Sequence, residues 1–232
     1  MNAAKTDLGT ALETLAAQGW FSRRSAQTRK RLGAIAKLRN FARNDRIYLA
    51  GDPPNGVFGL VSGSLNLSIP RADGENYTVH RAGTGFWFGD LALFSQGTRL
   101  VSIHAAEPTR VVHLPVRDLR KLVEEDARLY ADFYALTYEN FRTAFQIISN
   151  LAMSSADKRL ADRLLLELDA RGDGDGWVSV SQSELAGLAA VSVPTLKRVT
   201  RRFADAGLIH HGYGRIQVLD REELRRVCRG DA

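Results

Sequence analysis

The sequence predicts an α+β chain built from a β-rich N-terminal domain, a long helix and a C-terminal domain of short helices closed by a β-hairpin. Short β-like runs separated by turn residues, between about residues 40 and 114, are typical of a small barrel or sandwich. Residues 116–153 contain neither Gly nor Pro and repeat apolar residues at helical spacing. We expect domain boundaries that give residues 1–115, 116–153 and 154–232.

The composition is that of a globular protein with a polyanionic partner. The 232 residues carry a formal net charge of +6 and a pI of about 9.7, which favours nucleic acid as a ligand. Cys228 is the one cysteine in the sequence, so we expect neither an intrachain disulfide nor a cysteine-bound zinc or iron–sulfur cluster. We expect a protein of the reducing cytoplasm without a signal peptide or membrane span.

Two helices are expected to precede the β-rich region, over residues 1–21 and 25–38. The second is strongly basic at Arg29, Lys30 and Arg31, and we expect these charges to face solvent. The strands expected after it are Ile47–Ala50, Val57–Val61, Ser64–Ile69, Tyr77–His80, Phe86–Phe88, Leu100–Ala105 and Arg110–Leu114.

The long helix carries two apolar stripes. One repeats at alternating four- and three-residue steps, which is the pattern of a coiled-coil seam in a parallel homodimer. Its members are Tyr130, Tyr134, Thr137, Phe141, Ala144, Ile148 and Leu151. The other stripe, at Leu129, Phe133 and Leu136, can pack on the β-rich domain. Alternatively, a single helix buries both stripes in its own core. We expect a hinge at residues 150–155.

Residues 181–209 predict a helix-turn-helix followed by a hairpin. Ser181 and Glu184 form the pattern of a capping box, Ser192 is a second N-cap, and Gly207 is placed as a C-cap. Leu196, Val199 and Phe203 make the apolar face of the second helix. The opposite face is basic, with no acid between Ser192 and Asp205, and its cations are Lys197, Arg198, Arg201 and Arg202. Such a helix can enter a DNA major groove, although a solvated basic face is the alternative.

The motifs Ser-Gln-x-Glu-Leu-Ala, Val-Ser-x-x-Thr-Leu-x-Arg and Ala-Gly-Leu-Ile resemble the helix-turn-helix of the CRP/FNR family of bacterial transcription regulators. The β-rich region is similar to that family's jelly-roll-like, cyclic-nucleotide-binding β-roll. The resemblance implies a non-enzymatic, sequence-specific regulator with a winged helix-turn-helix. It implies a homodimer that binds a palindromic operator in double-stranded DNA through the helix near Ser192–Ala206, with RNA polymerase as a further partner.

The resemblance also assigns roles in DNA binding. Val193, Pro194 and Arg198 fall where the family contacts base edges, and an arginine there can bond guanine O6 and N7. Pro194 departs from the glutamate common at its place, and Ala190 stands where a turn glycine is frequent. The positions that correspond to phosphate contacts are Ser181, Ser183, Thr195, Lys197, Arg201 and Arg202.

Residues 88–101, which we call the cassette, resemble the phosphate-binding cassette of cyclic-nucleotide domains. By position, Gly89 and Leu91 give backbone contacts, Asp90 binds the ribose and Arg99 binds the cyclic phosphate. Asp90 is shorter than the usual glutamate, and Leu100 replaces a small residue. Asp90 and Arg99 could instead pair with each other or with the backbone, or the pocket could take a more apolar effector. The effector is therefore open, with a cyclic nucleotide as one candidate.

A different class of protein fits the β-rich region alone. His80, His104 and His113 lie on expected strands, and histidines on such a roll can bind a metal ion, as in cupin-like metalloenzymes. In that alternative the basic C-terminal part is an accessory domain. The sequence shows no His-x-His pair, and the alternation of side chains along strands gives no reason for the three to meet. Haem bound through a histidine is also open.

Overall fold

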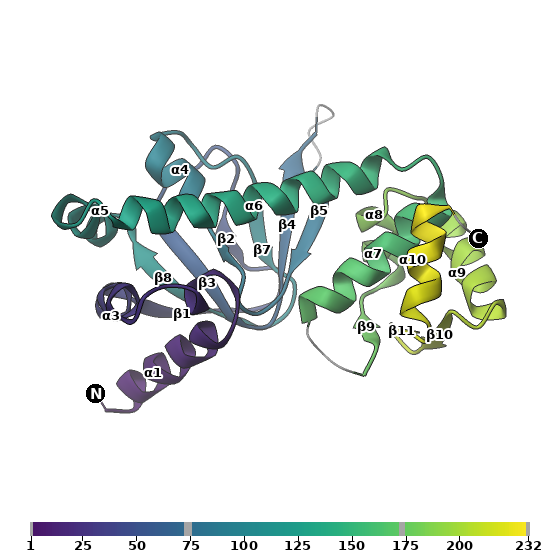
Figure 1. Cartoon of the computed structure of the whole chain (residues 1–232), viewed down its shortest axis with the longest axis horizontal. Coiled ribbons are helices and arrows are strands. Elements are labelled where there is room, and N and C mark those ends of the chain that lie inside the picture. Colours follow the sequence, from purple (N-terminus) through teal and green to yellow (C-terminus); the bar gives the residue numbers. More distant parts are fainter. Residues whose placement is uncertain (1, 72–75, 172–174, 231–232) are drawn as a thin grey trace. The chain divides into compact units, whose positions relative to one another are not determined.

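The computed structural model describes residues 2–71, 76–171 and 175–230. The chain divides into two compact units, the first made of residues 1–76 and 81–143, the second of residues 77–80 and 144–232. The division falls inside the long helix α6 (Leu129–Ala152), which Figure 1 shows as a single continuous ribbon. The turns expected at 70–76 and 172–176 lie largely outside the described residues.

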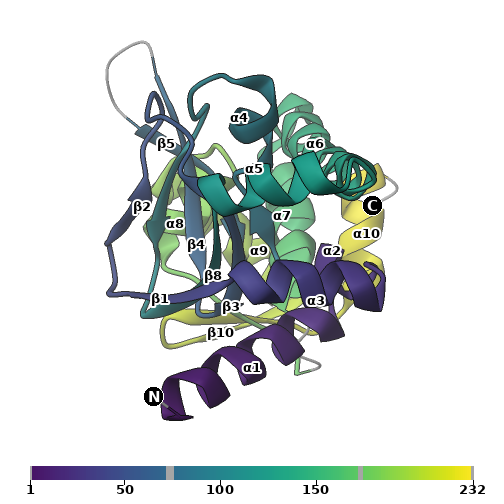
Figure 2. The same ribbon diagram turned by 90° about the vertical axis from the view of Figure 1, so that its left-hand side faces the viewer.

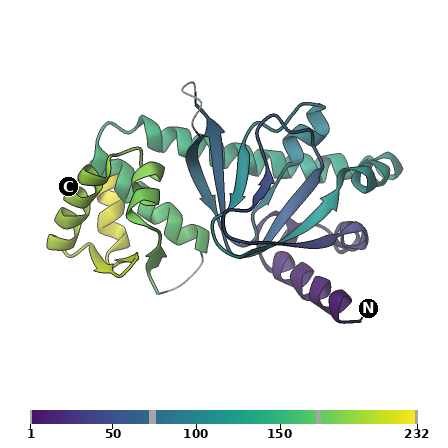
Figure 3. The same ribbon diagram turned by 180° about the vertical axis from the view of Figure 1, so that it is seen from behind.

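The first unit, together with residues 77–80, forms two antiparallel four-stranded sheets, which confirms the β-roll. One sheet has the order β1-β8-β3-β6 and the other β2-β7-β4-β5. The strands are β1 (Lys37–Phe41), β2 (Arg46–Tyr48), β3 (Gly56–Ser62), β4 (Leu65–Pro70), β5 (Asn76–Ala82), β6 (Trp87–Phe88), β7 (Ser102–Ala105) and β8 (Thr109–Pro115). Figure 3 shows the strands in front and α6 behind them.

Strand β3 lies between two apolar layers because its side chains alternate between the two faces of the sheet. Phe58 and Leu60 belong to the core between the sheets, whereas Val57 and Val61 belong to a second core beneath the helices. This second core includes Leu129, Phe133 and Leu136 of α6, which confirms that the inner stripe packs on the β-roll.

The leading segment forms α1 (Asn2–Ala17), α2 (Gly19–Ser22) and α3 (Ala26–Ile35). The helix expected to reach residue 38 ends at Ile35, because residues 37–41 join β8 as an unexpected edge strand. Leu38 lies opposite Val112 in that pairing. A strand with the sequence Lys-Leu-Arg-Asn-Phe has little apolar alternation, so its partner strand rather than its own pattern determines its conformation.

Residues 116–153 form two helices rather than the single expected one: α5 (Val116–Glu125) and α6. The break is at Asp126, whose backbone is extended (φ −147°, ψ 92°). Its carboxylate Oδ1 accepts a hydrogen bond from the Arg128 backbone N–H at 3.1 Å, which is the geometry of an Asx turn. Aspartate therefore ends α5 and forms the turn that leads into α6 without Gly or Pro.

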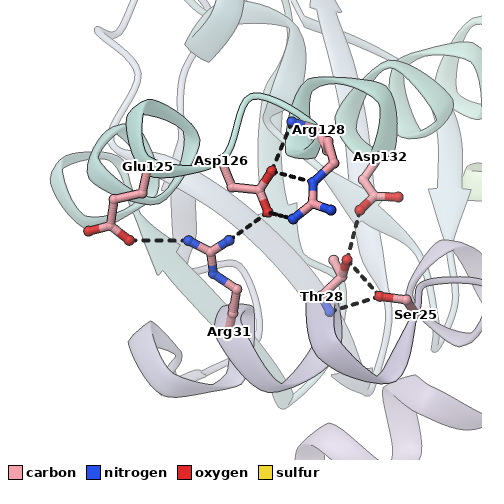
Figure 4. A network of polar contacts seen from close by, with 7 residues as sticks. All are labelled: Ser25, Thr28, Arg31, Glu125, Asp126, Arg128 and Asp132. Atoms are coloured by element: carbon pink, nitrogen blue, oxygen red, sulfur yellow. Dashed lines mark hydrogen bonds and ion pairs between the residues drawn. The ribbon is translucent and has the colours of Figure 1, made fainter.

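The basic helix α3 is tied to the corner between α5 and α6, as Figure 4 shows. Arg31 pairs with Asp126 at 2.7 Å and Glu125 at 3.1 Å, and Thr28 donates to Asp132 at 3.0 Å. Figure 2 shows α3 and α5 close together. The expectation that Arg31 faces solvent is therefore wrong, since acids far away in the sequence neutralise it. The Arg128 guanidinium, which hydrogen-bonds Asp126, lowers the pKa of that carboxyl to about 2.

The second unit contains α7 (Ala156–Arg171), α8 (Gln182–Leu188), α9 (Val193–Asp205) and α10 (Arg221–Arg229) around one core. Its three-stranded sheet has the order β10-β11-β9, from β9 (Trp177–Ser179), β10 (Ile209–Gly212) and β11 (Arg215–Val218). The hairpin β10–β11 confirms the expected wing. None of the helices in the described ranges is long and apolar enough to cross a membrane.

Candidate nucleic-acid interface and ligand cassette

Local side-chain hydrogen bonds define the start of both helices of the helix-turn-helix. The Ser181 hydroxyl accepts from the Glu184 N–H, and the Glu184 carboxylate accepts from the Ser181 N–H at 3.0 Å. Ser192 caps α9 by accepting from the Thr195 N–H at 3.3 Å. Satisfying the free N–H groups of each first turn explains why these short helices begin at the predicted residues.

The buried face of α9 is the predicted one, with Leu196, Val199 and Phe203 in the core of the unit. The helix ends as expected, with Gly207 in the left-handed region (φ 73°) directly after the last turn. The positions predicted for DNA contact that the structure exposes are Ser181, Ser183, Pro194, Lys197, Arg198, Arg201 and Arg202.

Several of the predicted DNA-contact residues have partners within the protein, among them the half-buried Thr195, whose hydroxyl lies 2.9 Å from that of Ser192. Val193 is half-buried and packs against the core, which limits what it can offer to a base. Arg202 forms an ion pair with Asp157 of α7. The Ser181 hydroxyl donates to Glu184 at 2.6 Å, so it serves the capping box. Arg198 and Arg201 form no ion pair among the described residues, and both lie on the exposed face of α9.

The wing carries an unpredicted aromatic and cationic cluster. The Arg215 guanidinium lies 3.9 Å from the centroid of the Trp177 ring, a cation–π contact that links β11 to β9. Tyr213 at the hairpin tip is fully exposed. Arg215 directly follows the turn glycines, so its charge could have been noted from the sequence, but its contact with Trp177 depends on strand pairing.

In the cassette, Arg99 is buried at 3% exposure and its guanidinium is bound to the roll itself. Nη1 donates to the Gly89 carbonyl at 2.7 Å, and Nη2 donates to the Gly56 carbonyl at 2.8 Å and to the Asn55 side chain at 2.7 Å. The group also lies 4.2 Å from the Tyr48 ring centroid. Its Nε is buried without a hydrogen-bond partner among the described residues.

Asp90 at the start of α4 (Asp90–Ser95) is 1% exposed and is bound by α6. The Thr137 hydroxyl donates to one carboxylate oxygen and the Asn140 amide donates to the other at 2.8 Å. Burial raises the pKa of Asp90, while these two donors oppose that rise. Burial likewise lowers the pKa of Arg99 and raises that of Tyr48. The structure therefore brings Asp90 and Arg99 into one site, but gives each of them internal partners.

The side chains of α6 differ in their exposure to solvent. Thr137, expected in the dimer seam, is half-buried, and its hydroxyl donates to Asp90. The exposed large side chains of α6 are Tyr130, Tyr134, Tyr138, Phe141, Phe145, Ile148 and Leu151. Ala144 is exposed among them. Tyr138 and Phe145 were missed, although each lies three or four residues from members of the expected seam.

The histidines expected on strands are on β5, β7 and β8, in two different sheets. His113 stacks on Phe58 with ring centroids 4.5 Å apart, and burial lowers its pKa. Over residues 2–71, 76–171 and 175–230, no three His, Cys, Asp or Glu side chains are placed to share a metal ion. The metal-binding alternative therefore has no ligand set within those ranges.

Comparison with known proteins finds a matching domain model in each part of the chain. A model of the cyclic nucleotide-binding domain matches residues 38–126, and a model of the Crp-like helix-turn-helix domain matches residues 158–227. A cyclic AMP receptor protein of Thermus thermophilus is 28% identical over 184 residues, 79% of this chain and 84% of that protein. A transcriptional activator of Pseudomonas aeruginosa, anr, is 29% identical over 207 residues, covering 84% and 82%. A crystal structure of a CRP-family regulator from Thermus thermophilus has a TM-score of 0.68 at 25% identity, covering 82% and 96%.

Proposed function

The chain belongs to the CRP/FNR family of DNA-binding transcription regulators, and from this we propose that it binds a palindromic operator as a homodimer. The observation that carries the proposal is the exposed basic face of α9. Both α8 and α9 are N-capped and pack on the core of the second unit, so this face is held in place. Two copies of α9 placed one duplex turn apart, about 34 Å, would read the two halves of the operator.

The dimer is supported by the exposed side chains of α6. Seven large apolar or aromatic residues are exposed along this one helix at three- and four-residue steps. A stripe of this kind on a helix is the surface that coiled-coil dimers bury, and contiguous apolar patches are rare on monomers. The partner proposed for this stripe is a second copy of the chain.

The proposal separates base reading from phosphate binding on α9. Arg198 is exposed near the N-terminal end of the helix, where base edges are contacted, and its planar guanidinium fits guanine. Arg201 lies one turn later on the same exposed face and is suited to a phosphate. The exposed Pro194 side chain carries no hydrogen-bonding group, so we expect no base-specific polar contact from it.

These roles predict different results for two matched substitutions. Arg198→Ala should cost about 1–3 kcal/mol of binding free energy and relax the preference at one base pair. Arg201→Ala should weaken binding to all sequences alike and reduce the salt dependence by about one unit of slope. Titrations of both variants on matched and mismatched duplexes at several salt concentrations measure this. An equal loss on every sequence for Arg198→Ala would contradict its base-reading role.

We further propose that the cassette serves as a structural part of the roll and does not bind a cyclic nucleotide. Arg99 and Asp90 are the two residues whose chemistry would recognise a cyclic phosphate and a ribose. Both are almost fully buried, and the polar atoms needed for a ligand are bound to Gly89, Gly56, Asn55, Thr137 and Asn140. A ligand would have to displace several of these hydrogen bonds.

If Arg99 is structural, Arg99→Gln should lower the free energy of unfolding of the ligand-free protein by about 1.5–3 kcal/mol, because buried acceptors lose a charged donor. Arg43→Gln is the control, since Arg43 is an exposed arginine of the same roll. Thermal unfolding with and without cyclic AMP or cyclic GMP completes the test. A ligand at a hundred times its dissociation constant would stabilise the wild type by about 2.7 kcal/mol. If a cyclic nucleotide stabilises the wild type by this amount but does not stabilise Arg99→Gln, the cassette is a ligand site.

Selection of random duplex DNA by the purified protein, with no nucleotide and with each cyclic nucleotide, tests the whole proposal. We expect a palindromic consensus without ligand. A consensus that needs a cyclic nucleotide would overturn the structural role of the cassette, and no enrichment under any condition would count against DNA reading by α9.

We also propose that the protein acts in the cytoplasm, with RNA polymerase as its partner and without enzymatic activity.

A further inference from the structure

The joint between α6 and α7 is closed by hydrogen bonds on the side of Asn150. This residue is 2% exposed, and its amide donates to the Arg159 carbonyl at 3.1 Å and to the Asp162 carboxylate at 2.7 Å. Its own carbonyl accepts from the Met153 N–H at 3.1 Å. Polar groups are therefore paired across the segment expected to be a hinge.

Arg159 on the first turn of α7 connects this bend to the turn of the helix-turn-helix. Its Nη1 donates to the Met153 carbonyl at 2.7 Å, directly after the end of α6. Its Nε donates to the Ala189 carbonyl at 3.0 Å, and Nη2 reaches the Ala190 carbonyl at the long distance of 3.5 Å. One planar guanidinium thus holds carbonyls from two segments that are more than thirty residues apart.

The turn that Arg159 holds is strained. Ala190 has a positive φ of 51°, a backbone conformation that alanine rarely adopts and glycine adopts freely. The amides of this turn are satisfied locally, since Ala190 N–H donates to Gly187 and Val191 N–H donates to Ala186. Arg159 supplies the donors for the carbonyls of Ala189 and Ala190 on the other side. The position of α9 depends on this turn, because Ser192 caps α9 immediately after it.

We infer that Arg159 is a positioning residue for DNA recognition: it holds the turn between α8 and α9 in its left-handed conformation and fixes that turn to the C-terminal end of α6. The inference rests on the proposed reading of DNA by α9. Lysine keeps the charge but has one nitrogen in place of the guanidinium fork, so it cannot hold the same carbonyls in both segments.

The experiment compares four full-length variants: Arg159→Lys, Ala190→Gly, the double variant, and Lys158→Gln as a control on the same helical turn. Hydrogen exchange of residues 186–192 is measured without DNA, and affinity is measured for the selected duplex and for random duplex. Arg159→Lys should speed exchange in the turn and weaken binding to the selected duplex about tenfold. Its affinity for random duplex should stay within about twofold, because phosphate contacts are intact.

Ala190→Gly should bind within about threefold of the wild type and should restore most of the affinity lost in Arg159→Lys, because glycine needs no outside support for a positive φ. If Arg159→Lys does not fold, folding of the double variant decides: a double variant that folds supports the inference, and one that also fails to fold overturns it. If the turn in Arg159→Lys exchanges as slowly as in Lys158→Gln, the inference is overturned. It is also overturned if Arg159→Lys loses the same affinity for the selected duplex and for random duplex. If the wild type prefers no duplex, the DNA proposal fails, while the exchange measurement still decides whether Arg159 holds the turn.

Discussion

Replacing Trp20 by alanine should lower the free energy of unfolding of the first unit by about 3–5 kcal/mol. The indole is 1% exposed, packs edge-on against Trp87 with ring centroids 5.1 Å apart, and stacks on Phe133 at 5.5 Å. Its Nε1 donates to the Asp132 carbonyl of α6 at 2.7 Å. The substitution therefore leaves a cavity among aromatic rings and removes a buried hydrogen bond in one step.

Scanning calorimetry resolves this effect from unfolding of the second unit, and Trp177→Ala is the matched control because Trp177 lies in that unit. Each kcal/mol should shift the midpoint of the affected transition by about 2–4 °C for a unit of this size. Trp20→Phe keeps an aromatic ring but loses the N–H, so we expect an intermediate loss. A transition that is unchanged in Trp20→Ala would show that the contacts of α2 with α6 do not stabilise the roll.

Placing a charge in the exposed stripe of α6 should convert the protein to monomers at micromolar concentration. Tyr134 is 74% exposed and Phe141 51%, so neither substitution removes a buried core residue of the protomer. In the Tyr134→Glu, Phe141→Glu double variant, four carboxylates would be brought together in the proposed seam without partners. Because the two half-sites are then bound independently, affinity for the palindromic duplex should fall by about 100-fold or more.

Sedimentation equilibrium and titration of one- and two-half-site duplexes measure these two effects. Leu219→Glu is the control for oligomeric state, because Leu219 is 55% exposed and lies outside α6. The affinity for a single half-site should be unchanged in the double variant, since α9 is intact. A double variant that remains dimeric would show that the chain associates through another surface.

The parts of the fold that could be predicted from the sequence depend on neighbours within a few residues. The capping box of Ser181 and Glu184 and the N-cap Ser192 lie beside their partners, so their spacing alone indicates the geometry. The Asx turn at Asp126 is equally local, yet it was missed, because aspartate within a periodic segment is compatible with both a continuous helix and a break.

The parts that could not be predicted depend on pairs that are distant in the sequence. Arg99 meets Asn55 and Gly56 from over forty positions away, and Asp90 meets Thr137 and Asn140 on another element. The resemblance of the cassette placed Asp90 and Arg99 in one site, with pairing to each other or to the backbone as an alternative to ligand contacts. Strand β1 was missed for the same reason, since β8 supplies its hydrogen bonds.

The attachment of Trp20 to α6 has a consequence for synthesis on the ribosome. Its hydrogen-bond partner, Asp132, is 112 positions later in the chain, and the core around it includes Phe133 and Leu136. At about 5–20 residues per second, the indole waits on the order of ten seconds before that helix has been made. A nascent chain that ends at the expected boundary, residue 115, holds every strand of the roll but none of α6. Truncations of the roll should therefore become soluble and protease-resistant only when they extend into α6 as far as about residue 143.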